Sequence, residues 1–282
     1  MNSDGFHVRA MRPDEVALPI YWAAGEGWNP GLADAACFAR ADPHGFFLGE
    51  LDGEAAATIS VVNYGERFAF LGFYIVRRDL RGRGYGLRIW QAGMAHAGER
   101  TVGLDGVIDQ QENYKKSGFT LAYRNVRHGG TIKPAEKPAR GIVDLAAVPF
   151  AAVLADDATV FPARRTGFLR GWTGAPGHVG RALMRDGKLV AWGVIRSCRV
   201  GCKIGPLIAD DFDAAAAVFD ALVIAKAGGD IFIDVPEPNR EAAALADERG
   251  LAPVFETARM YTGAIRPIAL PRIYGVTTFE LG

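Results

Sequence analysis

The residues whose types and spacing suggest chemistry are three alternating glycines set among arginines. The stretch Arg77–Gly86 reads RRDLRGRGYG, with Gly82, Gly84 and Gly86 at every second position. Glycine lets a backbone turn sharply and approach a ligand closely, which leaves main-chain N–H groups free to bind it. Together with the N-terminus of a following helix and the nearby arginines, such groups form an anion site. We therefore predict that this stretch binds a pyrophosphate.

Two elements must hold this loop in place. Phe68–Val76, FAFLGFYIV, is a run of nine apolar residues. Such a run predicts a central strand buried on both faces. Gly72 in its middle predicts a bulge or the close approach of another backbone. Leu87–Ala97 carries an apolar stripe at helical spacing and predicts an amphipathic helix directly after the loop.

Two common phosphate loops do not fit this stretch. A Walker loop needs Lys followed by Ser or Thr after its last glycine, whereas Leu87-Arg88 stands here, and the glycines lack GxGxxG spacing. Arg81, Gly84 and Gly86 instead match the pattern (Arg or Gln)-x-x-Gly-x-(Gly or Ala), which resembles the acetyl-CoA loop of the GCN5-related N-acetyltransferase (GNAT) superfamily. The resemblance implies acetyl-CoA as the acyl-donor cosubstrate. The residues implied to bind it are Phe73, Tyr74, Ile75, Val76, Arg81, Gly82, Arg83, Gly84, Tyr85 and Gly86.

A second motif supports this resemblance. Asn113–Phe119, NYKKSGF, resembles the family's Tyr-x-x-x-Gly-Phe motif. The resemblance implies that Tyr114 lies near the acyl-CoA sulfur and acts as a general acid. The alternative is a tyrosine that only packs under the cofactor. The family's usual asparagine, seven residues before the tyrosine, is replaced here by Val107, so contacts to the cofactor from that side are in doubt.

The whole chain resembles a two-domain subfamily of these proteins, with a complete first domain over roughly residues 5–128. The stretches that carry the resemblance are GFYIV, RGRGYG, LDGV, NYKKSGF, KIGPL, DVPEPN, RMYTG and GVTTFELG. In the second half, residues 204–211 read IGPLIADD where a pyrophosphate loop would stand, and the acids there disfavour phosphate. The resemblance therefore implies one cofactor site per chain and a degenerate second domain.

The order of expected elements repeats in outline in the two halves. We predict an α/β fold of two tandem GNAT-like domains, each a mixed, mostly antiparallel sheet flanked by helices. The boundaries are residues 1–130, a linker at 131–141 and residues 142–282, because GGTIKPAEKPARG at 129–141 is almost without apolar residues. A strand at Phe119–Arg127 should end before the linker. The second domain is expected to be structural or to cover the acceptor cleft, since residues 234–239, 256–261 and 274–280 are rich in polar and aromatic side chains.

The implied reaction is direct attack of an amine on a thioester. An alkylamine is mostly protonated at neutral pH, and a carboxylate, often through water, commonly helps to remove the proton. Many family members carry this acid on the strand before the loop, but Phe68–Val76 has none. Our candidate for the base is Glu26, in the turn GEGWN, with Trp28 as a candidate for lining the acceptor pocket. Asp105 and Asp109 are the other acids considered.

The composition limits the classes of binding partner, the location and the metal sites that we expect. Lys and Arg number 32 and Asp and Glu number 32, and this zero formal charge disfavours nucleic acid and anionic membranes as partners. The N-terminal MNSDGFHVRAM lacks the apolar core of a signal peptide and there is no long apolar run, so we expect a cytoplasmic protein. The three cysteines do not form a disulfide framework, and the five histidines lack metal spacing, so no metal is expected.

The sequence thus predicts an N-acetyltransferase that moves an acetyl group from acetyl-CoA to the primary amine of a small molecule. Because the strand acid is missing, the alternative is a non-catalytic acyl-CoA-binding sensor or interaction protein. An acyl group other than acetyl is also open, as is the formation of a homodimer.

Overall fold

The computed structural model describes residues 5–282; residues 1–4, the start of the stretch considered above as a signal peptide, lie outside it. The first half contains β1 (Phe6–Ala10), α1 (Ala17–Gly25), α2 (Asp34–Ala39), β2 (Phe46–Leu51), β3 (Glu54–Tyr64), β4 (Phe68–Val76), α3 (Tyr85–Ala97), β5 (Thr101–Val107), α4 (Gln111–Lys116) and β6 (Thr120–Ile132). The second half contains β7 (Ile142–Asp144), α5 (Phe150–Val160), α6 (Thr166–Thr173), β8 (His178–Arg185), β9 (Lys188–Ser197), β10 (Cys202–Ala209), α7 (Phe212–Ala225), β11 (Gly229–Pro236), α8 (Arg240–Glu248), β12 (Ala252–Tyr261) and β13 (Ile273–Gly275).

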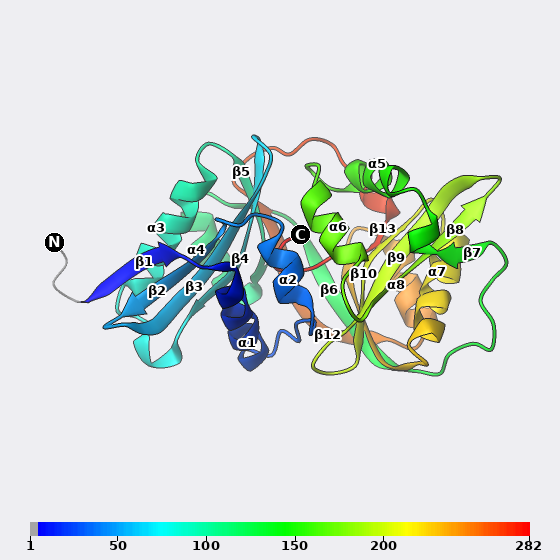
Figure 1. The fold of residues 1–282 in the computed structure, drawn as a ribbon, viewed down its shortest axis with the longest axis horizontal. Helices are drawn as coiled ribbons and strands as arrows, with labels where there is room; N and C mark the ends of the chain where they lie inside the picture. Colours follow the sequence, from blue (N-terminus) through cyan, green and yellow to red (C-terminus); the bar gives the residue numbers. More distant parts are fainter. Residues whose placement is uncertain (1–4) are drawn as a thin grey trace.

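The strands form one continuous sheet. Its order is β1-β2-β3-β4-β5-β12-β6-β11-β10-β9-β8-β7, with β13 paired to β10 (Figure 1). β12 of the second half pairs with β5, so that Met260 faces Leu104, and β6 of the first half pairs with β11, so that Gly129 faces Phe232. Each half therefore completes its sheet with a strand from the other half. This mixed sheet flanked by helices is the fold class predicted from the sequence.

Helices cover the sheet and also join the two halves. α3 packs on β3 and β4, while α7 packs on β8, β9 and β10. α2 and α6 meet between the halves, where the rings of Phe38 and Trp172 stack with their centroids 6.1 Å apart. Gly171 permits this approach, because a Cβ on it would lie 3.3 Å from the Arg40 side chain. The sequence did not predict α6, whose two glycines, Gly167 and Gly171, weaken its helical signal.

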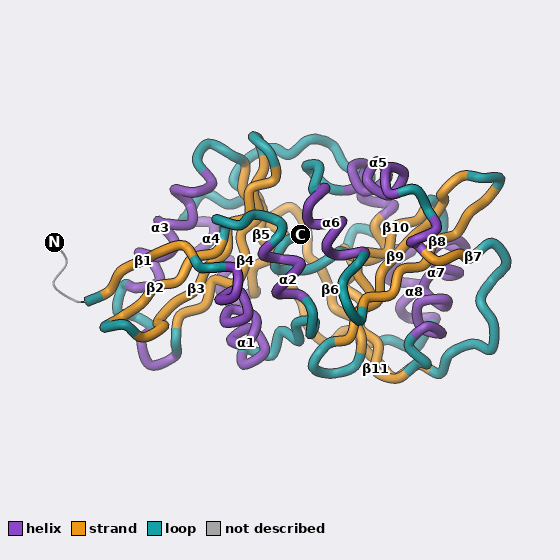
Figure 2. Tube along the Cα trace, in the orientation of Figure 1, coloured by secondary structure: helices purple, strands orange, loops and turns teal. Residues whose placement is uncertain are grey.

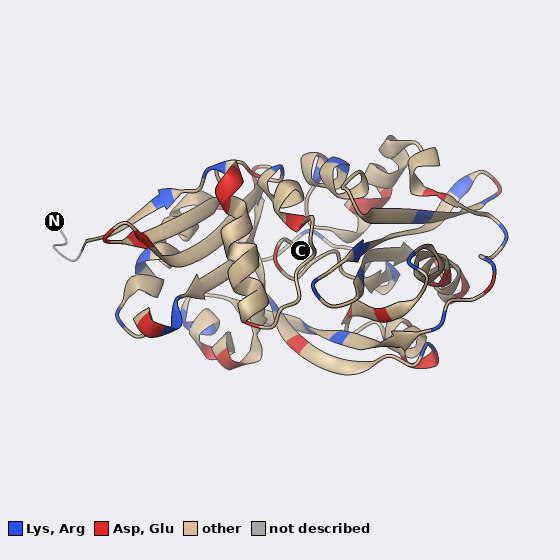
Figure 3. Cartoon of the chain, turned by 60° about the horizontal axis from the view of Figure 1, so that its bottom comes forward, with Lys and Arg blue, Asp and Glu red and all other residues tan. Residues whose placement is uncertain are grey.

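The surface carries charges of both signs. Lys and Arg residues, like Asp and Glu residues, occur in both halves of the chain (Figure 3). No helix within residues 5–282 is long and apolar enough to cross a membrane.

The predicted strand Phe68–Val76 is β4 with the same bounds, whereas α3 begins at Tyr85 and not at Leu87. The largest difference concerns β6, which was predicted to end at Arg127. It continues to Ile132 and so enters the predicted linker, of which residues 133–141 form a loop without helix or strand (Figure 2). The glycines that argued against a strand here instead allow neighbouring residues to pack closely on β6. A Cβ on Gly129 would lie 2.6 Å from the Phe232 ring.

Residues 276–282, called the 276–282 segment below, are buried and cross the central strands of both halves. A Cβ on Gly205 of β10 would lie 2.5 Å from the Thr277 carbonyl oxygen, and one on Gly72 of β4 would lie 2.1 Å from that of Glu280. The pairing of β4 with β3 also shifts register just after Gly72. The bulge and the close backbone approach predicted at Gly72 are therefore both confirmed.

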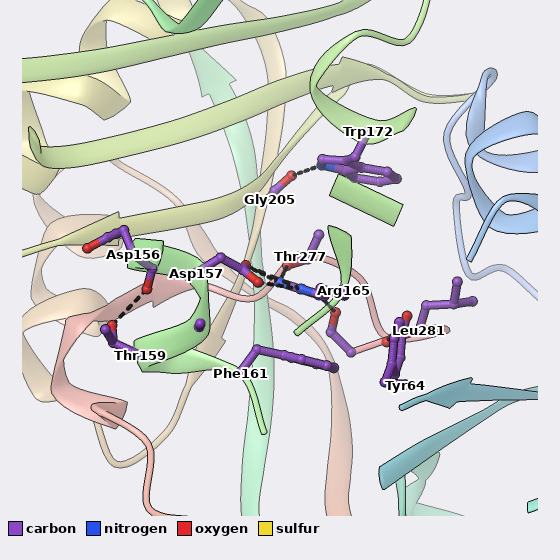
Figure 4. A network of polar contacts seen from close by, with 12 residues as sticks. Tyr64, Asp156, Asp157, Thr159, Phe161, Arg165, Trp172, Gly205, Thr277 and Leu281 are labelled. Carbon is purple, nitrogen blue, oxygen red and sulfur yellow. Dashed lines mark hydrogen bonds and ion pairs between the residues drawn. The ribbon is translucent and has the colours of Figure 1, made fainter. Parts of the chain in front are cut away.

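Arg165 anchors the 276–282 segment (Figure 4). Its guanidinium donates to Asp157 Oδ1 and to Thr277 Oγ1, both at 2.7 Å, and to the Gly282 carbonyl oxygen at 2.6 Å. From the first half, the Tyr64 hydroxyl donates to the Leu281 carbonyl oxygen at 3.1 Å. Side chains from both halves thus hold the segment in place.

Candidate active site

The candidate site lies where β4 and β5 separate. These parallel strands pair from Phe68 and Thr101 only as far as Leu71 and Leu104, and their later residues do not pair with each other in the described chain. At the bulge, Phe73 adopts a positive φ of 49°, which redirects β4. The gap opens into a cavity of about 660 Å³ lined by the last residues of both strands.

The loop after β4 and the N-terminus of α3 also line this cavity. Gly82 and Gly84 have φ values of 79° and 87°, a conformation that glycine adopts without steric cost. Gly84 is the N-cap of α3, and no side chain among residues 5–282 caps this N-terminus, so its first N–H groups are available to a ligand. Gly86 faces Tyr74, whose hydroxyl lies 2.6 Å from the position of a Cβ. The loop therefore has the geometry of an anion site.

Most of the sequence-predicted cofactor residues line the cavity, namely Phe73, Tyr74, Ile75, Val76, Arg81, Gly82, Gly84 and Gly86. Two of the predicted side chains do not. Arg83 is exposed outside the cavity, and Tyr85 is buried against Phe6, with ring centroids 4.6 Å apart. Successive side chains at a helix start point in different directions, which sends these two to solvent and to the core.

Tyr114 reaches the cavity from α4. Its ring stacks on Trp90 at 5.9 Å and meets Phe119 edge-on at 6.4 Å. Gly106 of β5 makes room for the ring, because a Cβ there would lie 2.2 Å from Tyr114 Cε2. Burial raises the pKa of Tyr114 above its usual value, and the neighbouring Tyr74 adds to this effect. The hydroxyl therefore stays protonated at neutral pH.

Glu26, the sequence-predicted base, lines the cavity beside the arginines. Its Oε1 accepts a hydrogen bond from Arg81 at 2.9 Å and from Arg78 at 3.3 Å. Trp28, the predicted acceptor-pocket residue, lines the same cavity. The predicted base and the predicted phosphate ligand Arg81 are thus ion-paired with each other.

The other two acids considered from the sequence differ in their surroundings. Asp105 is bound by Arg259 of β12, whose Nε and Nη2 donate at 2.7 and 2.6 Å, and Asn125 adds a third bond at 2.7 Å. Burial raises the pKa of Asp105, while Arg259 acts in the opposite direction. Asp109 lines the cavity from an exposed position. Asp105 is therefore engaged in joining β5 to β12 and β6.

The second half contributes four lining residues that sequence reasoning did not name individually. They are Phe255 and Thr257 of β12 and Phe279 and Glu280 of the 276–282 segment. The polar and aromatic stretches 256–261 and 274–280 were the only signal for Thr257, Phe279 and Glu280, and Phe255 lies outside both. Glu280 is 4% exposed, and burial raises the pKa of its carboxyl group.

The corresponding helix N-terminus of the second half is already occupied by a carboxylate. Asp211 is the N-cap of α7, and its side chain accepts a hydrogen bond from the Ala214 N–H at 2.7 Å. Its hydrogen bond with Arg185 and the Ala214 N–H lower the pKa of Asp211. A negatively charged cap repels a phosphate, in keeping with the degenerate loop read from the sequence. Within residues 5–282, no group of His, Cys, Asp and Glu side chains is placed to hold a metal ion.

Comparison with known protein families gives two matches. Residues 14–119 match the model described as the acetyltransferase (GNAT) family, and residues 153–275 match one described as an acetyltransferase (GNAT) domain. The chain is also 33% identical over 271 residues to the holothin acyltransferase of Pseudoalteromonas sp. (strain SANK 73390), covering 95% of this chain and 92% of that protein.

Solved structures share the fold. A Pyrococcus horikoshii structure described as an acetyltransferase has a TM-score of 0.84 and 22% identity, covering 100% of this chain and 98% of that one. A tandem GNAT protein from the clavulanic acid biosynthesis pathway has a TM-score of 0.60 and 12% identity, covering 92% of this chain and 99% of that one. With two family matches and a full-length relative, the chain belongs to the GNAT acetyltransferase family and is an acyl-transferring enzyme built from two GNAT domains.

Proposed function

We propose that this enzyme transfers the acetyl group of acetyl-CoA to the primary amine of a small molecule. The observation that carries the proposal is that one cavity includes both the gap between β4 and β5 and the glycine loop before α3. A CoA thioester needs an anion site for its pyrophosphate and a channel for its extended pantetheine arm. Arg81 and Gly84 would bind the pyrophosphate, and the gap would take the arm.

The free edge of β4 supports this placement of the pantetheine arm. Ile75 and Val76 pair with β3 on one side, while the side that faces β5 has no strand partner beyond Leu71 within residues 5–282. An unpaired strand edge can bind an extended amide chain as it would bind another strand. Backbone N–H groups near Phe73 would then lie beside the thioester, where one can stabilise the developing oxyanion.

The buried hydroxyl of Tyr114 suits it to protonate the leaving group. When the amine nitrogen attacks, a C–N bond forms and the C–S bond breaks, which releases a thiolate. A thiol has an ordinary pKa of about 8.5, well below the raised pKa of Tyr114, so the thiolate is a modest base and the proton transfer needs close positioning. Trp90 and Phe119 hold the ring rigidly enough to supply it.

Glu26 is the base that the sequence predicts, and its ion pairs suggest how it would be released. Arg81, which holds Glu26, is also the proposed ligand of the pyrophosphate. A bound pyrophosphate would compete for Arg81 and loosen its hold on the Glu26 carboxylate. Binding of acetyl-CoA would thereby weaken the ion pair of Glu26 with Arg81 and free the Glu26 carboxylate to act as a base.

The side chains around the cavity favour a small acceptor with an apolar body. Trp28, Phe255 and Phe279 supply aromatic surface, two of them from the second half of the chain. The relative at 33% identity is named for a single compound, holothin, which supports a small-molecule acceptor for this chain as well.

Release of free CoA, measured with a thiol-reactive dye over a panel of primary amines and acyl-CoA donors, tests the proposal. We expect turnover with acetyl-CoA and at least one amine, with the N-acetylated product identified by mass spectrometry. Tight CoA binding without turnover on any amine would favour the sensor. The R81A variant should bind acetyl-CoA about 10- to 100-fold more weakly, the loss typical of one charge-assisted hydrogen bond. R140A, in the exposed 133–141 loop, is the matched control.

A further inference from the structure

The carboxylates that line the cavity differ in what they contact. They are Glu26, Asp105, Asp109 and Glu280. Glu26 and Asp105 are bound by arginines, and Asp109 is exposed. Glu280 is 4% exposed, yet its carboxylate has no hydrogen bond or ion pair with another residue in the range 5–282. Neither oxygen of this carboxylate is a fully buried unpaired atom, so the group opens onto the cavity, where a ligand that donates hydrogen bonds can complete its contacts.

Three cations act on Glu280 at longer range, and each is engaged elsewhere. They are Arg127, Arg196 and Lys203. The two arginines form ion pairs with Asp234 at 2.6 Å and with Asp34 at 3.1 Å, and the lysine donates to the Asn29 carbonyl oxygen at 3.0 Å. Burial raises the pKa of Glu280 and these cations oppose the rise without cancelling it. Glu280 is therefore a stronger base than an exposed glutamate.

Glu280 also lies beside the part of β4 where the thioester would sit. Its backbone packs on Gly72, next to the bulge residue Phe73. Tyr114, the proposed acid, lines the same cavity from a different element, α4. An acceptor in this cavity would thus meet a carboxylate from the second half and a phenol from the first.

Resting on the proposed function, we propose that the Glu280 carboxylate binds the ammonium group of the acceptor amine and takes a proton from it. The 276–282 segment then forms part of the acceptor site. The substrate class is a small primary amine that is cationic at neutral pH and carries an apolar body, which packs against Trp28, Phe255 and Phe279.

The proton balance of this step is complete. The ammonium gives one proton to Glu280, and the neutral nitrogen attacks the thioester carbon. As the intermediate collapses, the C–S bond breaks and the thiolate takes a proton from Tyr114. The second proton of the amine nitrogen restores the Tyr114 hydroxyl through solvent, and Glu280 returns its proton to water. The products are an amide, CoA thiol and one released proton.

The test compares the wild type with E280Q, using an amine that the wild type acetylates. We expect kcat/KM for this amine to fall about 10²- to 10⁴-fold, the usual contribution of a positioned base. The residual rate of E280Q should rise tenfold per pH unit up to the pKa of the amine itself, because only free neutral amine then reacts. The wild type should instead level off above the pKa of Glu280, which Lys203, Arg196, Arg127 and Asp34 jointly influence. The Kd for acetyl-CoA should not change.

Two further variants separate this role from a structural one. E256Q changes a half-exposed glutamate of β12, which lies outside the cavity beside Arg124, and should leave the rate and its pH profile unchanged. E280D keeps a carboxylate one methylene further back and should recover part of the lost rate. An E280Q enzyme with wild-type kcat/KM and pH profile would overturn the role of Glu280 but not the proposed function. A fall in rate without a change of pH profile would do the same. A wild type that binds acetyl-CoA but acetylates no amine would overturn the proposed function itself.

Discussion

The carbonyl oxygen of Glu280 lies 2.1 Å from the point where a Cβ on Gly72 would stand. One residue belongs to the central strand of the first half and the other to the 276–282 segment, more than two hundred positions later. Only glycine leaves room for this contact, because the colliding atom belongs to a backbone that Arg165 and Tyr64 hold in place. The proposed acceptor side of the cavity thus depends on the absence of a side chain at Gly72.

The G72A substitution should therefore displace the 276–282 segment. We expect the free energy of unfolding in urea to fall by about 1–3 kcal/mol, the usual cost of overpacking a core. The kcat/KM for the acceptor should fall as well, because Phe279 and Glu280 would move together. G25A is a suitable control, since a Cβ at Gly25 meets no atom within 4 Å. Equal stability and activity of G72A and wild type would contradict the rigid placement of the segment.

Removing the Tyr114 hydroxyl tests the proposed acid. Y114F keeps the ring on Trp90, so we expect an unchanged melting temperature and acetyl-CoA affinity. The kcat should fall about 10²-fold, since the thiolate would leave without a proton donor. Y21F, which alters a tyrosine that is 64% exposed, should behave as wild type. An unchanged kcat in Y114F would mean that the tyrosine only packs under the cofactor.

The E26Q variant distinguishes the two candidate bases. If Glu280 takes the proton, E26Q should retain its kcat. Its Kd for acetyl-CoA should fall, because a neutral amide competes less well than a carboxylate for Arg78 and Arg81. Steady-state kinetics and calorimetric titration of acetyl-CoA would measure the two effects. A fall in kcat of about 10²-fold or more, with unchanged affinity, would return the role of base to Glu26.

His178 should make the fold sensitive to acid. Burial and, to a smaller extent, the charge of Arg196 lower the pKa of His178 to about 4, whereas an unfolded histidine has a pKa of about 6.5. Between these values the unfolded chain binds more protons than the folded one. The stability contribution is thus complete above about pH 6.5 and is lost as the pH falls towards about 4.

Urea unfolding of the wild type and of H178N between pH 4.5 and 7.5 checks this expectation. The free energy of unfolding of the wild type should drop by up to about 3 kcal/mol more than that of H178N on acidification. H44N, which changes an exposed histidine, should keep the wild-type slope. Parallel pH profiles for the wild type and H178N would show that His178 is not the acid-sensitive group.

The strand–loop–helix unit could be predicted from the sequence because its signals are local. An apolar run of nine residues predicts β4, and glycine spacing with flanking arginines indicates the anion site after it. The bulge at Gly72 follows from a glycine inside that strand. Tyr114 follows from a short motif whose spacing to the loop is set by one helix and one strand.

The proposed acceptor side of the cavity depends on tertiary structure. Phe255, Thr257, Phe279 and Glu280 line it only because β12 inserts between β5 and β6 and the 276–282 segment crosses Gly72. The ion pair that fixes this insertion, Arg259 with Asp105, joins residues 154 positions apart. Propensity and periodicity describe neighbours in the chain and carry no information about such a pairing.

Tertiary contacts also explain why β6 extends beyond its predicted end. Gly129 and Gly130 argue for a linker when read alone, yet they are the residues that allow β6 to pass close to Phe232 and Leu251. The family, the glycine loop after β4 and the zero net charge thus follow from the sequence alone. Which buried carboxylate of the cavity has no partner among residues 5–282 depends on tertiary structure, because burial and partners are properties of the assembled chain.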